Sequence, residues 1–284
     1  MSARLDPFAV RRAVAAALAE DLGERGDVTS DTIVPAERRA RARLVARGET
    51  VVAGLPVARE VFAALDDAVE FQALVAEGER ARPGQPIATV TGRARALLAG
   101  ERTALNFLMR MCGIATAARE AVDEISGTGA VILDTRKTAP GLRLLDKYAV
   151  AAGGARNHRL GLHDAAMIKD THRAVAGDLP RCVAALRARG LAAEAITVEV
   201  GTPEELDEAL AAGAGRALLD NMDLAALRAC VERARGRIVL EASGGLRPGT
   251  LRAVAETGVD CLSLGWLTHS ARAADLAMDL EPLD

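Results

Sequence analysis

The chain alternates between short apolar runs and amphipathic stretches, and the rhythm of this pattern changes near residue 130. Before that point, apolar residues at helical spacing predict a helix over 7–22 and a longer helix over 94–125. Between the two helices, alternating apolar and polar residues predict strands that are separated by turns. These strands are expected over 39–49, 50–57, 69–75 and 85–92, with a further helix over 58–66. The first third of the chain is therefore predicted to be an α+β unit.

From residue 130 onward, short apolar runs recur, each ends in a polar or charged residue, and helical segments lie between them. Such alternation predicts parallel strands joined by crossover helices. Because no dinucleotide-binding fingerprint follows the first of these strands, the pattern favours a barrel over a doubly wound sheet. The predicted strands are 130–134, 165–170, 195–200, 216–220, 237–243 and 260–265.

Composition narrows the class of protein. The chain has 284 residues, of which 50% are hydrophobic and 26% charged, as in globular proteins with ample core. No apolar run approaches the roughly 20 residues of a membrane span, and the N-terminus lacks a signal-peptide pattern. A net charge of -3 with scattered arginines argues against a nucleic-acid surface. Four cysteines without paired spacing predict thiols in a reducing cytoplasm.

The distribution of lysine points to one region. The lysines of the chain are Lys137, Lys147 and Lys169, and they fall in the stretch 133–172 beside three of the four histidines. Lysine and arginine are not interchangeable, because lysine is a compact point charge and arginine a planar fork. Basic residues also outnumber acidic ones in this stretch, although the whole chain is acidic. We therefore expect a site for a strongly anionic ligand.

The candidate side chains fall at the carboxyl ends of the predicted strands, where barrels place their chemistry. Cations clamp carboxylates or phosphates, whereas neighbouring acids can hold Mg²⁺ or ribose hydroxyls. The glycines of 243–246 could supply backbone N–H donors to a phosphate. Each feature alone is also explained by a turn or a helix cap, but together they favour a polyanion plus a sugar phosphate. The cationic set is Arg136, Lys137, His158, Arg159 and Lys169, and the acidic set is Asp170, Glu199 and Asp220.

The motifs in these positions resemble those of a known family. LDTRKTAPGLRLLDKYAV, GGARNHRLGLHDAAMIKDTH, VEV, LLDN, EASGG and GWLTHS are similar to the ordered motifs of quinolinate phosphoribosyltransferases, and GDVTSD and ERTALNFLMRMCGIAT extend the likeness over nearly the whole chain. The resemblance implies Mg²⁺-dependent transfer of phosphoribosyl from phosphoribosyl pyrophosphate to quinolinate, with loss of CO₂. It also implies a homodimer and an α/β fold. The expected domains are an N-terminal α/β sandwich over 1–115, with 270–284 as a candidate addition, and an open, incomplete α/β barrel of parallel strands over 116–269.

The resemblance also implies roles for individual residues. Lys137 would lie between the quinolinate and phosphoribosyl sites. Glu199 and Asp220 would hold the ribose hydroxyls and Mg²⁺, with Asp170 nearby. In the dimer, Arg102 would complete the neighbouring subunit's site. The quinolinate carboxylates would be held by Arg102, Arg136, His158, Arg159 and Lys169, and the 5′-phosphate by Ser243, Gly244, Gly265 and His269. The chain departs from the family pattern at Ala155, Thr171, Gly201 and Trp266.

Three alternatives stay open at this level. The first is a phosphoribosyltransferase that uses nicotinate and releases no CO₂, although the number of cations favours a dicarboxylate. The second is an aldolase-like lyase with a Schiff base on Lys137 or Lys169, which needs a desolvated lysine. The third is a non-catalytic sensor of sugar phosphates.

Overall fold

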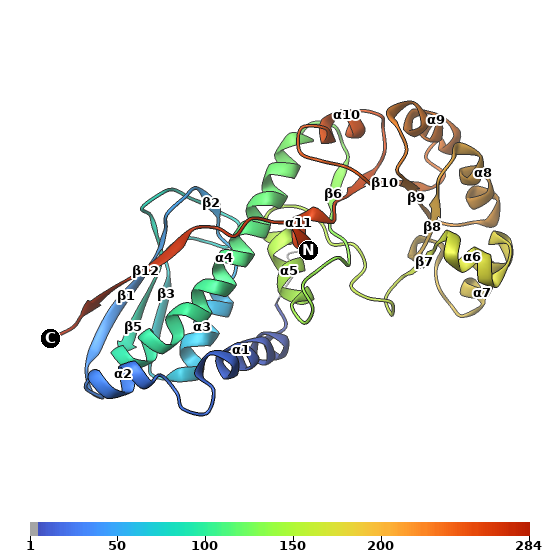
Figure 1. Ribbon diagram of the computed structural model, residues 1–284. Coiled ribbons are helices and arrows are strands. Elements are labelled where there is room, and N and C mark those ends of the chain that lie inside the picture. Colours follow the sequence, from blue (N-terminus) through green and yellow to red (C-terminus); the bar gives the residue numbers. More distant parts are fainter. Residues whose placement is uncertain (1–4) are drawn as a thin grey trace. The chain divides into compact units, whose positions relative to one another are not determined.

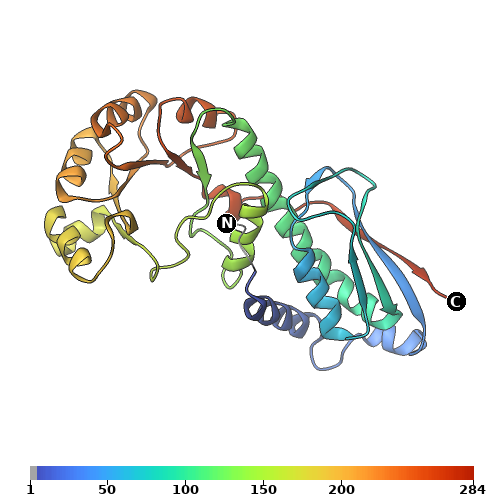
Figure 2. The same ribbon diagram turned by 180° about the vertical axis from the view of Figure 1, so that it is seen from behind.

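The computed structural model describes residues 5–284, and the chain forms two compact units (Figures 1 and 2). The N-terminal unit comprises the chain up to residue 119 together with 138–154 and 267–284. The barrel unit comprises 120–137 and 155–266. The segment 138–154, which the predicted division placed in the barrel domain, thus belongs to the N-terminal unit.

The N-terminal unit is built on a four-stranded antiparallel sheet in the order β12-β1-β5-β3, and a separate pair joins β2 to β4. The last strand of the chain therefore pairs with the first. The helices of the unit are α1 (Pro7–Leu22), α2 (Val28–Ile33), α3 (Leu55–Leu65), α4 (Ala94–Glu124, which ends in the barrel unit), α5 (Arg143–Ala152) and α11 (Trp266–His269). Its strands are β1 (Arg39–Ala46), β2 (Thr50–Val51), β3 (Glu70–Ala73), β4 (Arg80–Ala81), β5 (Pro86–Arg93) and β12 (Leu276–Pro282).

Close packing in this unit depends on two glycines of α4. A Cβ on Gly100 would lie 2.9 Å from the ring of Phe62, so the missing side chain lets α4 pack against α3. A Cβ on Gly113 would overlap the backbone carbonyl oxygen of Arg272. The C-terminal segment crosses α4 at this point, where the amide of Ala274 donates to the carbonyl of Met109 at 2.8 Å.

The N-terminal unit differs locally from the predicted elements at two places. The stretch 50–57 is a strand only at its beginning, because Gly54 adopts a left-handed φ of 103° and Pro56 starts α3. The polar segment after α1, for which no helix was predicted, contains α2, whose first amides donate to the side chain of Asp27.

The barrel unit holds six parallel strands in the order β6-β11-β10-β9-β8-β7. Helices line the outer side of the curved sheet (Figure 1). Among the described residues, no strand pairing joins β6 to β7, so the barrel is open. The predicted fold class, a sandwich plus an open, incomplete barrel, is confirmed. The strands are β6 (Val131–Leu133), β7 (Ala166–Ile168), β8 (Ile196–Val200), β9 (Arg216–Asp220), β10 (Val239–Ser243) and β11 (Cys261–Ser263). The helices are α6 (Asp170–Ala176), α7 (Leu179–Ala188), the short 3₁₀ turn η1 (Ala193–Ala195), α8 (Pro203–Ala212), α9 (Leu224–Ala234) and α10 (Leu251–Ala255).

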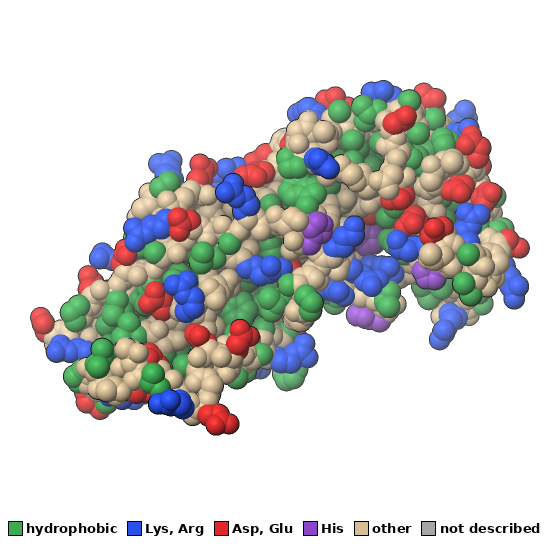
Figure 3. Space-filling model, in the orientation of Figure 1, with side chains coloured by type: hydrophobic (Ala, Val, Ile, Leu, Met, Phe, Trp, Pro, Cys, Tyr) green, Lys and Arg blue, Asp and Glu red, His purple; other side chains and the backbone are tan. Residues whose placement is uncertain are grey.

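Aliphatic side chains fill both cores, as the scarcity of aromatics predicts. Leu44 and Ile87 are fully buried in the N-terminal unit, and Ile196, Leu206 and Leu219 in the barrel unit. Basic and acidic side chains are interspersed on the surface drawn in Figure 3. None of the helices in the described part of the chain is long and apolar enough to cross a lipid bilayer.

Candidate active site

A cavity of about 280 Å³ opens at the carboxyl ends of the barrel strands. It collects residues from every strand of the open barrel, since each strand end or the loop after it contributes at least one side chain. Eight predicted site residues line it: Arg136, Lys137, His158, Arg159, Lys169, Glu199, Asp220 and Ser243. The predicted cationic and acidic sets therefore share one cavity.

The cationic side of the cavity is a crowded group of positive charges. Burial and the neighbouring charge of Arg136 both lower the pKa of Arg159. Arg159 is held in place by its guanidinium, which donates to the carbonyl oxygen of Ala165 at 2.9 Å. Two arginines that destabilise each other's charge would both be stabilised by an anion between them. This arrangement suits a ligand with more than one negative charge.

Lys169 joins the cationic side to the acidic side. It follows β7, and its Nζ lies 2.7 Å from Oε2 of Glu199, which projects from the adjacent β8. The Lys169 side chain is 44% exposed and engaged by a carboxylate, whereas a Schiff-base lysine needs a desolvated amine. The contact thus opposes the lyase alternative at Lys169.

The loops after β9 and β10 support each other beside Asp220. Asn221 has a positive φ of 54°, its side-chain amide donates to Asp220 at 2.9 Å, and its backbone amide donates to the carbonyl of Ser243 at 2.9 Å. A Cβ on Gly244, whose φ is 91°, would overlap the Asn221 side chain. Only glycine therefore lets the two strand ends meet here.

Trp266 packs onto the glycine-containing loop. Its indole Nε1 donates to the carbonyl of Leu246 at 3.1 Å. Trp266, at which the chain departs from the family pattern, therefore supports the loop after β10. It is also the only tryptophan of the chain, which makes it a fluorescent reporter beside the loop.

Five predicted site residues do not line the cavity. Asp170 is exposed at the start of α6, directly after Lys169, and Gly244 directly follows Ser243. Gly265 lies in the barrel unit, one residue before Trp266. Arg102 is exposed on α4 and His269 is exposed at the end of α11, both in the N-terminal unit.

Sequence reasoning assigned no role to two buried carboxylates, one of which, Glu241, belongs to the lining of the cavity. Glu241 and Asp134 are fully buried, and both contact His158. Asp134 ends the predicted strand 130–134 and Glu241 lies in the predicted strand 237–243, but nothing in the sequence shows that they meet one histidine. The usable signal is a charged residue inside an apolar strand, as Glu241 is in VLEAS.

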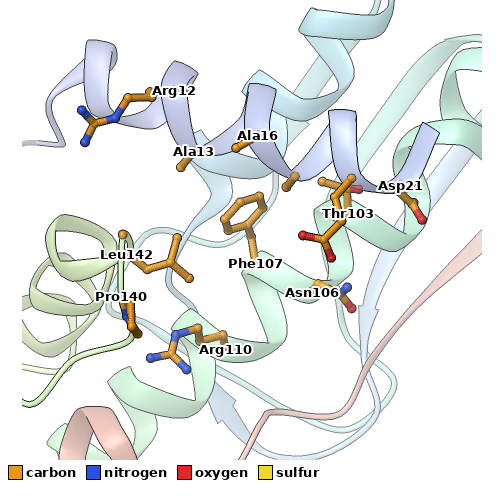
Figure 4. Close-up of a pocket in the computed structure, with 13 residues that line it drawn as sticks. Arg12, Ala13, Ala16, Asp21, Thr103, Asn106, Phe107, Arg110, Pro140 and Leu142 are labelled. Atoms are coloured by element: carbon orange, nitrogen blue, oxygen red, sulfur yellow. The ribbon is translucent and has the colours of Figure 1, made fainter. Parts of the chain in front are cut away.

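A larger cavity of about 660 Å³ lies in the N-terminal unit, between α1, α4 and the loop before α5 (Figure 4). Phe107 points into it, and Ala13, Ala16 and Leu142 add further apolar surface. Arg110, on its wall, is already engaged by the buried carboxylate of Asp146 at 2.7 and 2.8 Å. Two arginines, Arg12 and Arg110, and two acids, Glu20 and Asp21, also line this cavity.

Comparison with known proteins agrees with the fold. Residues 27–112 match the N-terminal domain of quinolinate phosphoribosyl transferase, and residues 114–279 match its C-terminal domain. The chain is 44% identical to the nicotinate-nucleotide pyrophosphorylase [carboxylating] of Mycobacterium leprae, over 96% of this chain and 97% of that protein. It is also 44% identical to a probable enzyme of the same name from Bacillus subtilis, over 92% and 90% of the two chains.

Solved structures show the same relationship. The crystal structure of NadC from Streptococcus pyogenes superposes with a TM-score of 0.94 at 37% identity, covering 99% of both chains. The nicotinate-nucleotide pyrophosphorylase of Francisella tularensis superposes with a TM-score of 0.92 at 34% identity, again over 99% of both chains. Fold and site define an open-barrel protein whose strand ends gather cations and carboxylates around one cavity. More particularly, the chain belongs to the quinolinate phosphoribosyl transferase family.

Proposed function

We propose that the protein transfers the phosphoribosyl group of phosphoribosyl pyrophosphate to quinolinate and releases CO₂. The products are nicotinate mononucleotide, pyrophosphate and CO₂, and the reaction belongs to de novo NAD biosynthesis. The observation that carries the proposal is the single cavity in which cations face carboxylates at adjacent strand ends.

The cationic side is proposed to bind quinolinate. Its two neighbouring carboxylates repel each other and need several fixed positive groups. Arg136, His158, Arg159 and Lys169 line the cavity together, and charge-assisted hydrogen bonds from such groups are short and strong. Lys137 lies in the same wall and is proposed to act between the two substrates.

The acidic side is proposed to bind the ribose and Mg²⁺. Glu199 and Asp220 project from paired strands into the cavity. Among residues 5–284, no cluster of three or more histidine, cysteine or acidic side chains is arranged to hold a metal ion. Two carboxylates fit an ion that is held mainly by substrate phosphates and water. We therefore propose that Mg²⁺ enters with phosphoribosyl pyrophosphate. Asp170 is proposed to lie near this side, and Ser243, Gly244, Gly265 and His269 are proposed to contact the 5′-phosphate.

The geometry supports an ordered series of bond changes. The ring nitrogen of quinolinate attacks C1′ of the ribose as the bond from C1′ to pyrophosphate breaks. Positive charge develops on the ribose, and the preorganised carboxylates of Glu199 and Asp220 stabilise it. The bond from C2 to its carboxylate then breaks and CO₂ leaves. The electron pair on C2 is stabilised by the ring nitrogen, now positively charged, and takes up a proton from water.

We further propose a cytoplasmic homodimer in which Arg102 completes the quinolinate site of the partner subunit. An exposed arginine on α4 supports this role, because a cation directed at solvent is available to a second copy. The cytoplasmic location is supported by the four cysteines, all of which are free thiols.

Incubation of the purified protein with phosphoribosyl pyrophosphate, Mg²⁺ and one pyridine substrate tests the proposal. Quinolinate should give nicotinate mononucleotide, whereas nicotinate should give little product because it lacks the second carboxylate. Efficient use of nicotinate would favour the non-decarboxylating alternative. Binding of phosphoribosyl pyrophosphate without any turnover would favour the sensor.

A further inference from the structure

Glu241 is a fully buried carboxylate in the middle of the barrel sheet. It is the third residue of β10, where it lies opposite Leu218 of β9 and Cys261 of β11. Its Oε2 is 3.2 Å from Nη2 of Arg216 and 3.2 Å from Nε2 of His158. A buried charge persists only when such partners compensate for its lost hydration. Burial alone would raise the pKa of Glu241, but His158, Ser263 and Arg216 together lower it below the ordinary value.

His158 connects the buried Glu241 to the next residue of the cavity wall, Arg159. Its side chain is 11% exposed, and its Nδ1 accepts a hydrogen bond of 2.6 Å from the backbone amide of Arg159. Because Nδ1 is an acceptor, the ring proton lies on Nε2 and faces Glu241. The backbone amide of His158 in turn donates to Asp134 at 2.8 Å. The ring is therefore fixed between a buried carboxylate and the backbone of the next residue.

This linkage ends at a side chain that needs orientation. Arg159 is partly desolvated and stands near the like charge of Arg136 and the opposite charge of Asp164. Its backbone is fixed by His158 and its guanidinium by Ala165. Arg216, the other partner of Glu241, begins β9 and therefore approaches from the strand end opposite to the cavity mouth.

We propose that Glu241 is a positioning residue of the quinolinate site: its charge holds the ring of His158, which fixes the backbone of Arg159 and so aims the guanidinium at the substrate. The proposal rests on the proposed function, since it names quinolinate as the ligand. Glu241 belongs to the cavity lining, but its side chain is 0% exposed because His158 and other neighbours cover it, so it acts through His158 rather than by touching the substrate.

The test is a Glu241→Gln variant, which keeps the shape and removes the charge. We expect quinolinate affinity by calorimetry to fall about ten- to a hundredfold, the range for a lost hydrogen bond to a charged group. Turnover at saturating quinolinate should change much less. Imidazole ¹⁵N spectra should show the Nε2-protonated form of His158 in the native protein and a mixture of tautomers in the variant.

The matched control is Asp66→Asn, which removes another buried carboxylate with an arginine partner, Arg93, in the N-terminal unit. It should leave quinolinate affinity unchanged. Glu241 also compensates the charge of Arg216, and a Glu241→Gln/Arg216→Gln double variant tests whether that compensation alone explains its effect. The affinity of the double variant for quinolinate should remain low, and recovery of native affinity would overturn the proposal.

If Glu241→Gln does not fold, Arg216→Gln decides the matter. That variant keeps the charge on Glu241 and its contact with His158, so quinolinate affinity should stay near the native value. A loss as large as the one expected for Glu241→Gln would overturn the proposal, as would native affinity and an unchanged His158 spectrum in folded Glu241→Gln. A wild-type protein without quinolinate turnover would instead contradict the proposed function.

Discussion

At the scale of single residues, Lys169 shows why arginine should not be able to replace the lysines of the site. Its ammonium group lies 2.7 Å from Glu199 in a wall shared with two arginines. A guanidinium is larger and planar, so Lys169→Arg keeps the charge but not the contact. We expect kcat/KM of this variant to fall about ten- to a hundredfold. A similar fall in kcat/KM is expected for Lys137→Arg. The control is Arg252→Lys, an exchange in an exposed ion pair with Glu256. Near-native kcat/KM in both lysine variants would show that these lysines are incidental.

The acidic residues should separate chemistry from binding. Glu199→Gln and Asp220→Asn remove charge from the proposed ribose side, where positive charge develops during transfer. Loss of one such stabilising group costs about 2.7–4 kcal/mol, or roughly 10²–10³ in kcat. Calorimetry should find quinolinate affinity close to that of the native protein. If affinity collapses while bound substrate still turns over, the division of the cavity into two sides is wrong.

At the scale of elements, a substitution at Gly113 of α4 sets helix propensity against close packing, and the change in stability shows which of the two is larger. In an isolated helix, Gly→Ala adds about 1 kcal/mol of stability. In α4, the new Cβ would overlap the carbonyl oxygen of Arg272, and overpacking costs about 1–3 kcal/mol. We expect Gly113→Ala to lower the free energy of unfolding measured with denaturant. The control is Gly48→Ala, where a Cβ meets nothing within 4 Å. A more stable Gly113→Ala protein would show that the C-terminal segment does not press on α4.

The same scale shows what sequence pattern can predict. The six barrel strands were predicted because apolar runs and polar ends repeat, and that repetition also placed Lys169, Glu199 and Asp220 at one edge. Near Gly54 the predicted strand is replaced by the start of α3, because the left-handed glycine and the following proline favour a helix start, and periodicity does not detect such local effects. The contacts of Glu241 escaped prediction for another reason. They join β10 to the start of β9 and to the loop before β7, and such neighbours are set by tertiary packing.

At the scale of the whole molecule, the proposed homodimer predicts complementation between inactive variants. Arg102→Ala and Lys137→Ala proteins, each nearly inactive, are mixed under conditions that exchange subunits. If Arg102 serves the partner's site, each mixed dimer has one doubly damaged site and one intact site. Random exchange should then restore about a quarter of native activity, as expected for a symmetric dimer.

The control for this experiment is a mixture of Lys137→Ala and Lys169→Ala. Both residues line the same cavity of one chain, so every site in a mixed dimer keeps one lesion. No activity should return. Absence of recovery in the first mixture, despite demonstrated exchange of subunits, would overturn the shared site.

One cavity is proposed to bind a dicarboxylate and to couple phosphoribosyl transfer to decarboxylation. Quinolinate labelled with ¹⁴C either in the C2 carboxylate or in the C3 carboxylate tests this proposal most directly. With phosphoribosyl pyrophosphate and Mg²⁺, the C2 label should leave as CO₂ in equal amount to the nicotinate mononucleotide formed, and the C3 label should stay in the nucleotide. Without phosphoribosyl pyrophosphate, no label should be released. Nucleotide formation without release of the C2 label, or release without phosphoribosyl pyrophosphate, would contradict the account.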